Sequence, residues 1–112
     1  MLPETRKRLN DMKKAADLIS TFITGKTLDD FKADELLRSG VCYQFVIVGE
    51  ALTVIRGTER SIAEQISEFT RIVAFRNQVV HGYEKIDDEI TWRIIEQKIP
   101  VLKAELDELL SR

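Results

Sequence analysis

The sequence predicts an all-α fold, an antiparallel bundle of four to five helices. Three observations predict it. Apolar residues recur at steps of three and four along most of the chain, which is the spacing of one helix face. Only five Gly and two Pro occur among 112 residues, a balance typical of helix-rich domains. The four main helical segments are joined by short connections, which place neighbouring helices antiparallel.

Two helices are expected in the first third of the chain. Helical periodicity begins near Glu4, and we expect it to stop at Gly25. Thr27, with Asp30 three residues later, forms a capping box that opens a short helical piece running toward Arg38. The apolar stripe of the first helix consists of Leu9, Met12, Ala16, Ile19 and Ile23.

The middle of the chain predicts two further helices. Ser39 and Gly40 are expected to separate the short piece from the most apolar segment, residues 41–55, whose wide apolar stripe implies packing on more than one side. After a polar connection, Ser61 and Glu64 form a second capping box. The helix that it opens carries the apolar residues Ile66, Phe69, Val73 and Val80.

The last helix follows a turn. Gly82 is expected to end the preceding helix in a left-handed conformation, and Asp87 or Asp88 to cap the final one. Pro100 lies inside the final helix and removes one backbone hydrogen bond, which predicts a kink. The expected apolar seam of this helix is Ile90, Ile94, Val101, Leu102, Leu106 and Leu109.

Size and composition limit the class of protein. A chain of 112 residues predicts a single domain over residues 1–112. No uninterrupted apolar run approaches the ~20 residues that a membrane-spanning helix needs, and the N-terminal stretch has no apolar segment behind its charges. We therefore expect a cytoplasmic location without a membrane. The net charge of −2 provides no global basic field for nucleic acid. Cys42 is the only cysteine, which excludes an internal disulfide and predicts a small buried apolar residue.

One polar cluster interrupts the apolar pattern, in the stretch FRNQVVHGYEKID of residues 75–87. It holds His81, the only histidine, five residues after Arg76. At about 100° per residue, Asn77 and His81 are neighbours on one helix face, whereas Arg76 lies on another. Arg76 and His81 can therefore converge only through helix ending, side-chain reach or a second copy of the protein.

These residue types suit cleavage of RNA, because RNA carries its own nucleophile in the 2′-hydroxyl. Histidine has an unperturbed pKa of ~6.5 and can accept or donate a proton near neutral pH. The guanidinium of Arg76 matches phosphate oxygens, and Asn77 can orient a hydroxyl or donate to a phosphate. No metal or other cofactor is expected, since one histidine without a cysteine cluster makes a poor zinc site.

The same residues also have plainer interpretations. A histidine at a helix C-terminus often stabilises the helix dipole, and Arg76 can be a surface or ion-pairing residue. Tyr83 can be a half-buried aromatic at a corner. Tyr43 and Glu50 lie on the most apolar helix without an obvious partner, so Glu50 either orients Arg76 or His81 or is an ordinary satisfied polar residue.

Residues 76–83, RNQVVHGY, fit the Arg-x4-His-x-Tyr signature and resemble the HepT-like toxins of the HEPN superfamily. The stretch VIVGEAL of residues 46–52 resembles the central helix of that family. Residues 72–110 resemble its C-terminal half, including the proline inside the last helix, so the resemblance covers most of the chain.

This resemblance implies a HEPN-type all-α bundle and a two-fold homodimer with the motif helices facing each other in a cleft. It implies a metal-independent endoribonuclease, the toxin of a toxin–antitoxin pair, with RNA as substrate and an MNT-type nucleotidyltransferase as antitoxin. By position, Arg76 and His81 are the implied catalytic pair and Asn77 has a supporting role. Tyr83 is the implied hydroxyl that the partner modifies with AMP. Such a dimer also answers the separation of Arg76 and His81, because one chain can supply each group.

Two alternatives stay open. The chain can be a non-catalytic helical partner that binds a nucleotidyltransferase and helps to present its substrate. It can also be a structural dimer whose motif only caps a helix. The complete set of Arg76, His81 and Tyr83 favours the ribonuclease, since a pure binding module has no need of it.

Overall fold

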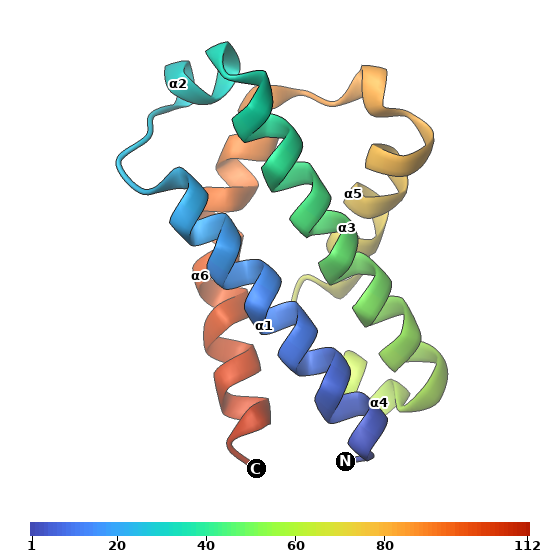
Figure 1. Ribbon diagram of the computed structural model, residues 1–112. Coiled ribbons are helices and arrows are strands. Elements are labelled where there is room, and N and C mark those ends of the chain that lie inside the picture. The colour runs from blue at the N-terminus through green and yellow to red at the C-terminus, as the bar shows by residue number, and fades with distance from the viewer.

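The computed structural model describes all 112 residues and contains only helices and their connections. Four long helices, α1, α3, α5 and α6, alternate in direction, and both termini lie at the same end of the bundle (Figure 1). This confirms the predicted all-α antiparallel bundle. The elements are α1 (Pro3–Ile23), α2 (Leu28–Ala33), α3 (Glu35–Thr58), α4 (Arg60–Ala63), α5 (Phe69–His81), the 3-10 turn η1 (Tyr83–Lys85) and α6 (Asp88–Leu110).

The predicted start of the short second helix is confirmed, but its predicted end is wrong. The hydroxyl of Thr27 accepts a hydrogen bond from the Asp30 N–H, and the Asp30 carboxylate accepts one from the Thr27 N–H. The chain then breaks at Asp34 rather than at Ser39 and Gly40, because the Asp34 carboxylate caps α3 by accepting from the Leu37 N–H at 3.0 Å. Gly40 continues the helix.

The second predicted capping box is also wrong. Glu64 forms an ion pair with Arg60 at 2.8 Å and makes no cap with Ser61. The expected long helix is instead divided into α4 and α5 by a connection over residues 64–68. As a result α5 begins only at Phe69, and its direction is independent of α4.

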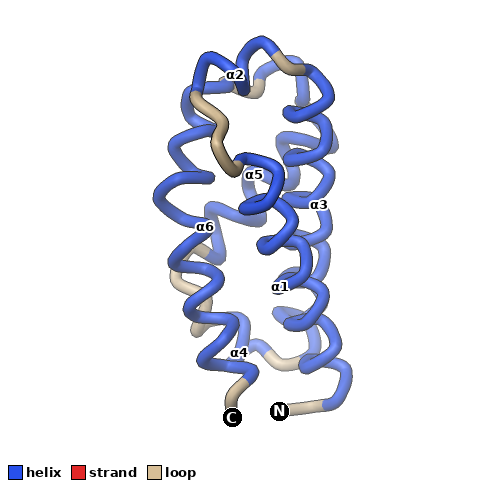
Figure 2. The backbone as a smooth tube through the Cα atoms, turned by 60° about the vertical axis from the view of Figure 1, so that its left-hand side comes forward, coloured by secondary structure: helices blue, strands red, loops and turns tan.

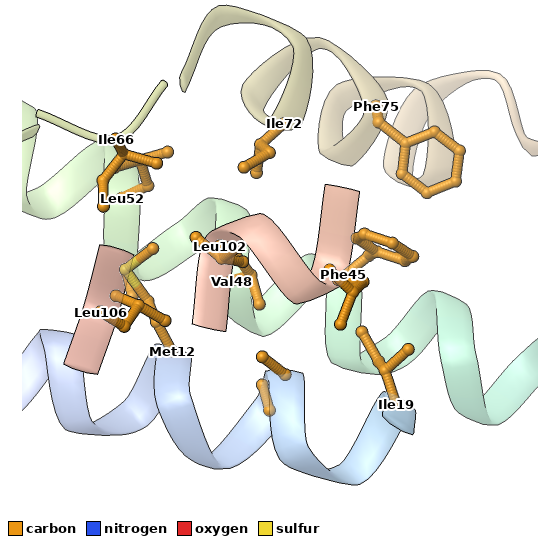
Figure 3. Close-up of a cluster of buried hydrophobic side chains, with 14 of the residues drawn as sticks. Met12, Ile19, Phe45, Val48, Leu52, Ile66, Ile72, Phe75, Leu102 and Leu106 are labelled. Atoms are coloured by element: carbon orange, nitrogen blue, oxygen red, sulfur yellow. The ribbon is translucent and has the colours of Figure 1, made fainter. Parts of the chain in front are cut away.

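The core is one cluster of 24 buried apolar side chains. Figure 3 shows α1, α3, α5 and α6 all contributing to it, with Phe75 of α5 lying over Phe45 of α3. Helix α3 packs against α1 on one side and α5 on another, and α6 packs against α1. Seen from the side, α5 lies between α6 and α3 (Figure 2). The motif helix is therefore fixed mainly by its packing on α3.

Helix α3 is long and apolar enough, by length and composition alone, to cross a membrane. The expectation that no segment is long and apolar enough to span a membrane is therefore not met. Its buried residues, among them Val41, Phe45 and Leu52, form part of the bundle core, and a core helix meets the same criteria. This feature is weak support for a membrane segment.

The buried side of α6 differs from the predicted seam in the first half of the helix. Ile90 and Val101 are exposed, at 54% and 44%, and Ile94 is half-buried. The reason is Trp92, which packs against Phe31 of α2 with ring centroids 5.3 Å apart. The side of α6 that carries Trp92 therefore faces the core. The buried residues are Thr91, Trp92, Ile95, Ile99, Leu102, Leu106 and Leu109. Pro100 is exposed and does not end the helix.

Glu59 fastens the start of α1 to the end of α3. Its carboxylate accepts hydrogen bonds from the Leu2 backbone N–H at 2.8 Å and from the buried Thr5 hydroxyl at 2.6 Å. It also lies 3.6 Å from the N-terminal ammonium. These interactions, the Leu2 bond first, lower the pKa of the Glu59 carboxyl below its ordinary value of 4.5.

We expect Glu59→Gln to destabilise the protein at pH 7 and to have less effect in acid. A carboxyl with a lowered folded-state pKa contributes stability above its unfolded value of 4.5, and the contribution is lost as the pH falls through the lowered value. Urea unfolding midpoints of wild type and variant between pH 3 and pH 7 check this. A gap between the two that stays constant across this range would contradict the prediction.

Candidate active site

The site is built at the C-terminal half of α5, which the core holds against α3. Ile72 and Phe75 are the buried residues of α5, and the Phe75 ring meets Phe45 edge-on with centroids 4.9 Å apart. At the start of the helix, the Arg56 guanidinium lies 5.5 Å from the Phe69 ring centroid. Phe69, Ile72 and Phe75 recur at steps of three and therefore lie on one side of α5, the side that packs into the core.

Arg76 lies where α5 comes closest to α3. A Cβ added at Gly49 would lie 2.4 Å from the Arg76 Cβ and 2.6 Å from its Cγ, distances that real side chains do not adopt. Only glycine allows the two helices to approach this closely. The glycine inside the VIVGEAL stretch is therefore required by the placement of Arg76.

The guanidinium of Arg76 is held from two sides. Its Nη2 donates to the Glu50 carboxylate in an ion pair, and its Nη1 donates to the Asn77 Oδ1 at 2.8 Å. The Arg76 side chain is 22% exposed. Each terminal nitrogen carries two hydrogens, so one on each remains for a further acceptor. The buried Nε has no hydrogen-bond partner.

His81 is the last residue of α5, and it is exposed. Gly82 follows with φ −157°, which is outside the left-handed region, so the predicted left-handed helix end is wrong. The helix ends instead because η1 begins at once: the Gly82 N–H donates to the Gln78 carbonyl at 2.8 Å, and the Gln78 side chain donates to the Lys85 carbonyl at 3.1 Å. Tyr83 opens η1 and is 72% exposed.

The sequence matches the model of the family described as "Ribonuclease HepT-like" over residues 12–109. The chain belongs to this family. The match covers α3 and α5 in full, α1 from residue 12 on and α6 up to residue 109, and it includes the whole Arg76–Tyr83 motif. The resemblance that the motif and the VIVGEAL stretch indicated is thereby confirmed.

Three relatives are similar to this HepT-like chain over most of its length. A Thermococcus cleftensis protein named "Probable ribonuclease HepT" is 26% identical over 90% of this chain and 91% of its own length. Two Methanocaldococcus jannaschii proteins carry the words "putative RNase" in their names. One is 25% identical over 88% of this chain and 90% of its own length. The other, named also as a gamma-glutamylcyclotransferase, is 26% identical over 99% of this chain and 50% of its own length. No solved structure gave a significant match.

Within the HepT-like chain, the predicted site residues fall into two groups. Arg76 lies against α3 and is hydrogen-bonded to the exposed Asn77, whereas His81 and Tyr83 are exposed at and just after the end of α5. Arg76 and His81 lie about 140° apart around the helix, as their spacing predicts. Glu50 was open between two roles, and the structure makes it the partner of Arg76. Gly49 was missed, although an isolated glycine in an apolar helix signals a close approach.

Proposed function

We propose that the protein is a metal-independent endoribonuclease that acts in the cytoplasm, with Arg76 and His81 as its catalytic residues. Membership of the ribonuclease HepT-like family supports the activity. The relatives that are named as ribonucleases support it as well. The observation that carries the assignment of residues is the Arg76 guanidinium, fixed by Glu50 and Asn77 five positions before an exposed histidine at a helix end.

In the proposed reaction, the ribose 2′-oxygen attacks the adjacent phosphorus and the bond from phosphorus to the 5′-oxygen breaks. The products are a 2′,3′-cyclic phosphate and a 5′-hydroxyl. The attacking hydroxyl loses a proton and the leaving oxygen gains one, and the His81 imidazole serves one of these transfers. The free N–H groups of Arg76 stabilise the negative charge that builds on the phosphate. Asn77 supports this role because it orients the guanidinium.

A second copy of the chain is proposed to complete the site. On α3, Tyr43 and Glu50 are seven residues apart and share a face, and Tyr43 is 65% exposed. On α5, Val80 is four residues after Arg76 and is 43% exposed. We propose that these exposed side chains, on the helix faces that carry Glu50 and Arg76, form a surface that a two-fold partner covers, with Arg76 of one protomer meeting His81 of the other.

The protein is further proposed to be the toxin of a toxin–antitoxin pair whose antitoxin is an MNT-type nucleotidyltransferase. The Tyr83 hydroxyl is the proposed site of AMP transfer, and its exposure at the start of η1 supports access by a modifying enzyme. An adenylate there adds bulk and negative charge two residues from His81, where an RNA phosphate has to lie. The alternative function is that of a non-catalytic partner of a nucleotidyltransferase. Such a protein would also expose Tyr83 but would not cut RNA.

We expect the purified wild-type protein to cut single-stranded RNA in the presence of EDTA. Its products should carry 2′,3′-cyclic phosphate ends, which resist a phosphomonoesterase until they are opened by acid. Gel electrophoresis of end-labelled RNA measures both. A 2′-deoxy oligonucleotide of the same sequence is the matched control, because it lacks the nucleophile. Cutting of that control, or a requirement for a divalent metal, would contradict the proposal.

A further inference from the structure

A groove lies between α5 and α6. The two helices do not pack directly on each other, since α5 lies on α3 and α6 lies on α1 (Figure 2). The groove has a volume of about 450 Å³. Residues of both helices line it. Its four apolar residues are Ala74, Phe75, Ile90 and Ile94.

The groove carries local positive charge on a protein of net charge −2. Arg71, Arg93 and Lys98 line it, and no carboxylate does. Glu68 lies beside it and forms ion pairs with Lys98 at 2.9 Å and with Arg71 at 3.7 Å. Arg93 is exposed and forms no ion pair, so its whole charge is free for an anionic ligand.

The groove leads to the proposed catalytic histidine. Along α5, Arg71, Ala74, Gln78 and His81 follow at steps of three and four, so they form one row about 15 Å long. The first three line the groove, and His81 is the exposed next member of the row. A chain of phosphates bound in the groove therefore has a direct course to the imidazole.

We propose that this groove binds the backbone of single-stranded RNA, with phosphates on Arg93 and Arg71. Gln78 and Gln97 offer amides to sugars or base edges, and the apolar floor of Phe75, Ile90 and Ile94 accepts an unstacked base. A duplex keeps its bases paired and cannot use that floor. Ile90 has no role in the core and is 54% exposed, so its side chain is available for this contact. The inference rests on the proposed function for its direction toward His81, but binding in the groove requires no catalysis.

Fluorescence anisotropy with a labelled, uncleavable 2′-O-methyl RNA tests the groove. We expect Arg93→Ala to raise Kd about tenfold and to lower the slope of log Kd against log salt by about 0.7, the loss of one phosphate contact to a single strand. Arg8→Ala on α1, which removes the same charge from another face, should leave Kd within about twofold. Equal effects of the two substitutions would overturn the proposal.

Three further outcomes separate the alternatives. If Arg93→Ala weakens binding of a duplex as much as binding of the single strand, the single-stranded assignment is wrong. If the wild type does not cut RNA but loses binding on Arg93→Ala, the ribonuclease proposal fails and the groove stands. If the wild type cuts RNA, but Arg93→Ala and Arg8→Ala bind RNA equally well, the proposed RNA-binding groove is wrong and the ribonuclease proposal stands.

Discussion

Replacing His81 by alanine is expected to lower the rate of RNA cleavage by about 10²- to 10⁴-fold, the range for loss of a general acid or base. No other histidine exists in the chain to replace it. The side chain is exposed at the last residue of α5, so the substitution removes no core contact and the fold should be unchanged. Initial rates on a labelled RNA, together with circular dichroism and the urea midpoint, measure the two effects separately.

The matched control is Thr70→Ala, an exposed position on the same helix that lies far from the motif. It should cut RNA at the wild-type rate. Cleavage that persists in His81→Ala at the wild-type rate would locate the chemistry elsewhere or show a contaminating nuclease.

The same variant distinguishes a site shared between protomers from one within a protomer. In a heterodimer of Arg76→Ala with His81→Ala, a shared arrangement leaves one of the two sites with both groups intact. An equal mixture that re-associates at random contains half heterodimers, each with half the sites, so about a quarter of wild-type activity should return. If each site is formed within one protomer, every site has one lesion and no activity returns.

Local signals predicted the helices, but competing interactions between neighbouring residues decided where several of them begin and end. The Thr27–Asp30 capping box is confirmed because both hydrogen bonds form within one turn. The Ser61–Glu64 pair has the same spacing and the same kinds of residue, but Glu64 forms an ion pair with Arg60 and no cap forms. Gly40 was expected to break a helix. Instead its position continues α3, with room for a Cβ no closer than 3.5 Å to the Phe22 ring.

The site was predictable in its residues but not in its surroundings. The Arg76–Tyr83 motif is contiguous in sequence, so its letters alone indicated the chemistry. The ion pair of Arg76 with Glu50 was only one of two interpretations that the sequence left open, because Glu50 is 26 residues away on another helix. The groove between α5 and α6 could not be predicted either. It depends on Trp92 packing against Phe31, which turns Ile90 and Ile94 out of the expected seam.

Gly49→Ala is expected to destabilise the protein by about 1–3 kcal/mol, although alanine favours a helix over glycine by about 1 kcal/mol. The new methyl group would lie 2.4 Å and 2.6 Å from the Arg76 Cβ and Cγ. These atoms are close to the α5 backbone, so the clash cannot be relieved by rotation of a flexible side-chain tip. Helix α5 has to move away from α3, and the guanidinium then loses its place beside Glu50. A misplacement of about 1 Å costs about 10²-fold in rate when it affects a catalytic group.

Gly57→Ala is the matched control, because it makes the same substitution in the same helix and its Cβ would meet nothing within 4 Å. It should stabilise the protein by up to about 1 kcal/mol and leave RNA cleavage unchanged. If α3 and α5 meet at Gly49, the urea midpoints of the two variants therefore move in opposite directions, and the cleavage rate falls only in Gly49→Ala. A Gly49→Ala protein as stable and as active as Gly57→Ala would mean that Arg76 is not held by this contact, and the proposed geometry of the site would have to be abandoned.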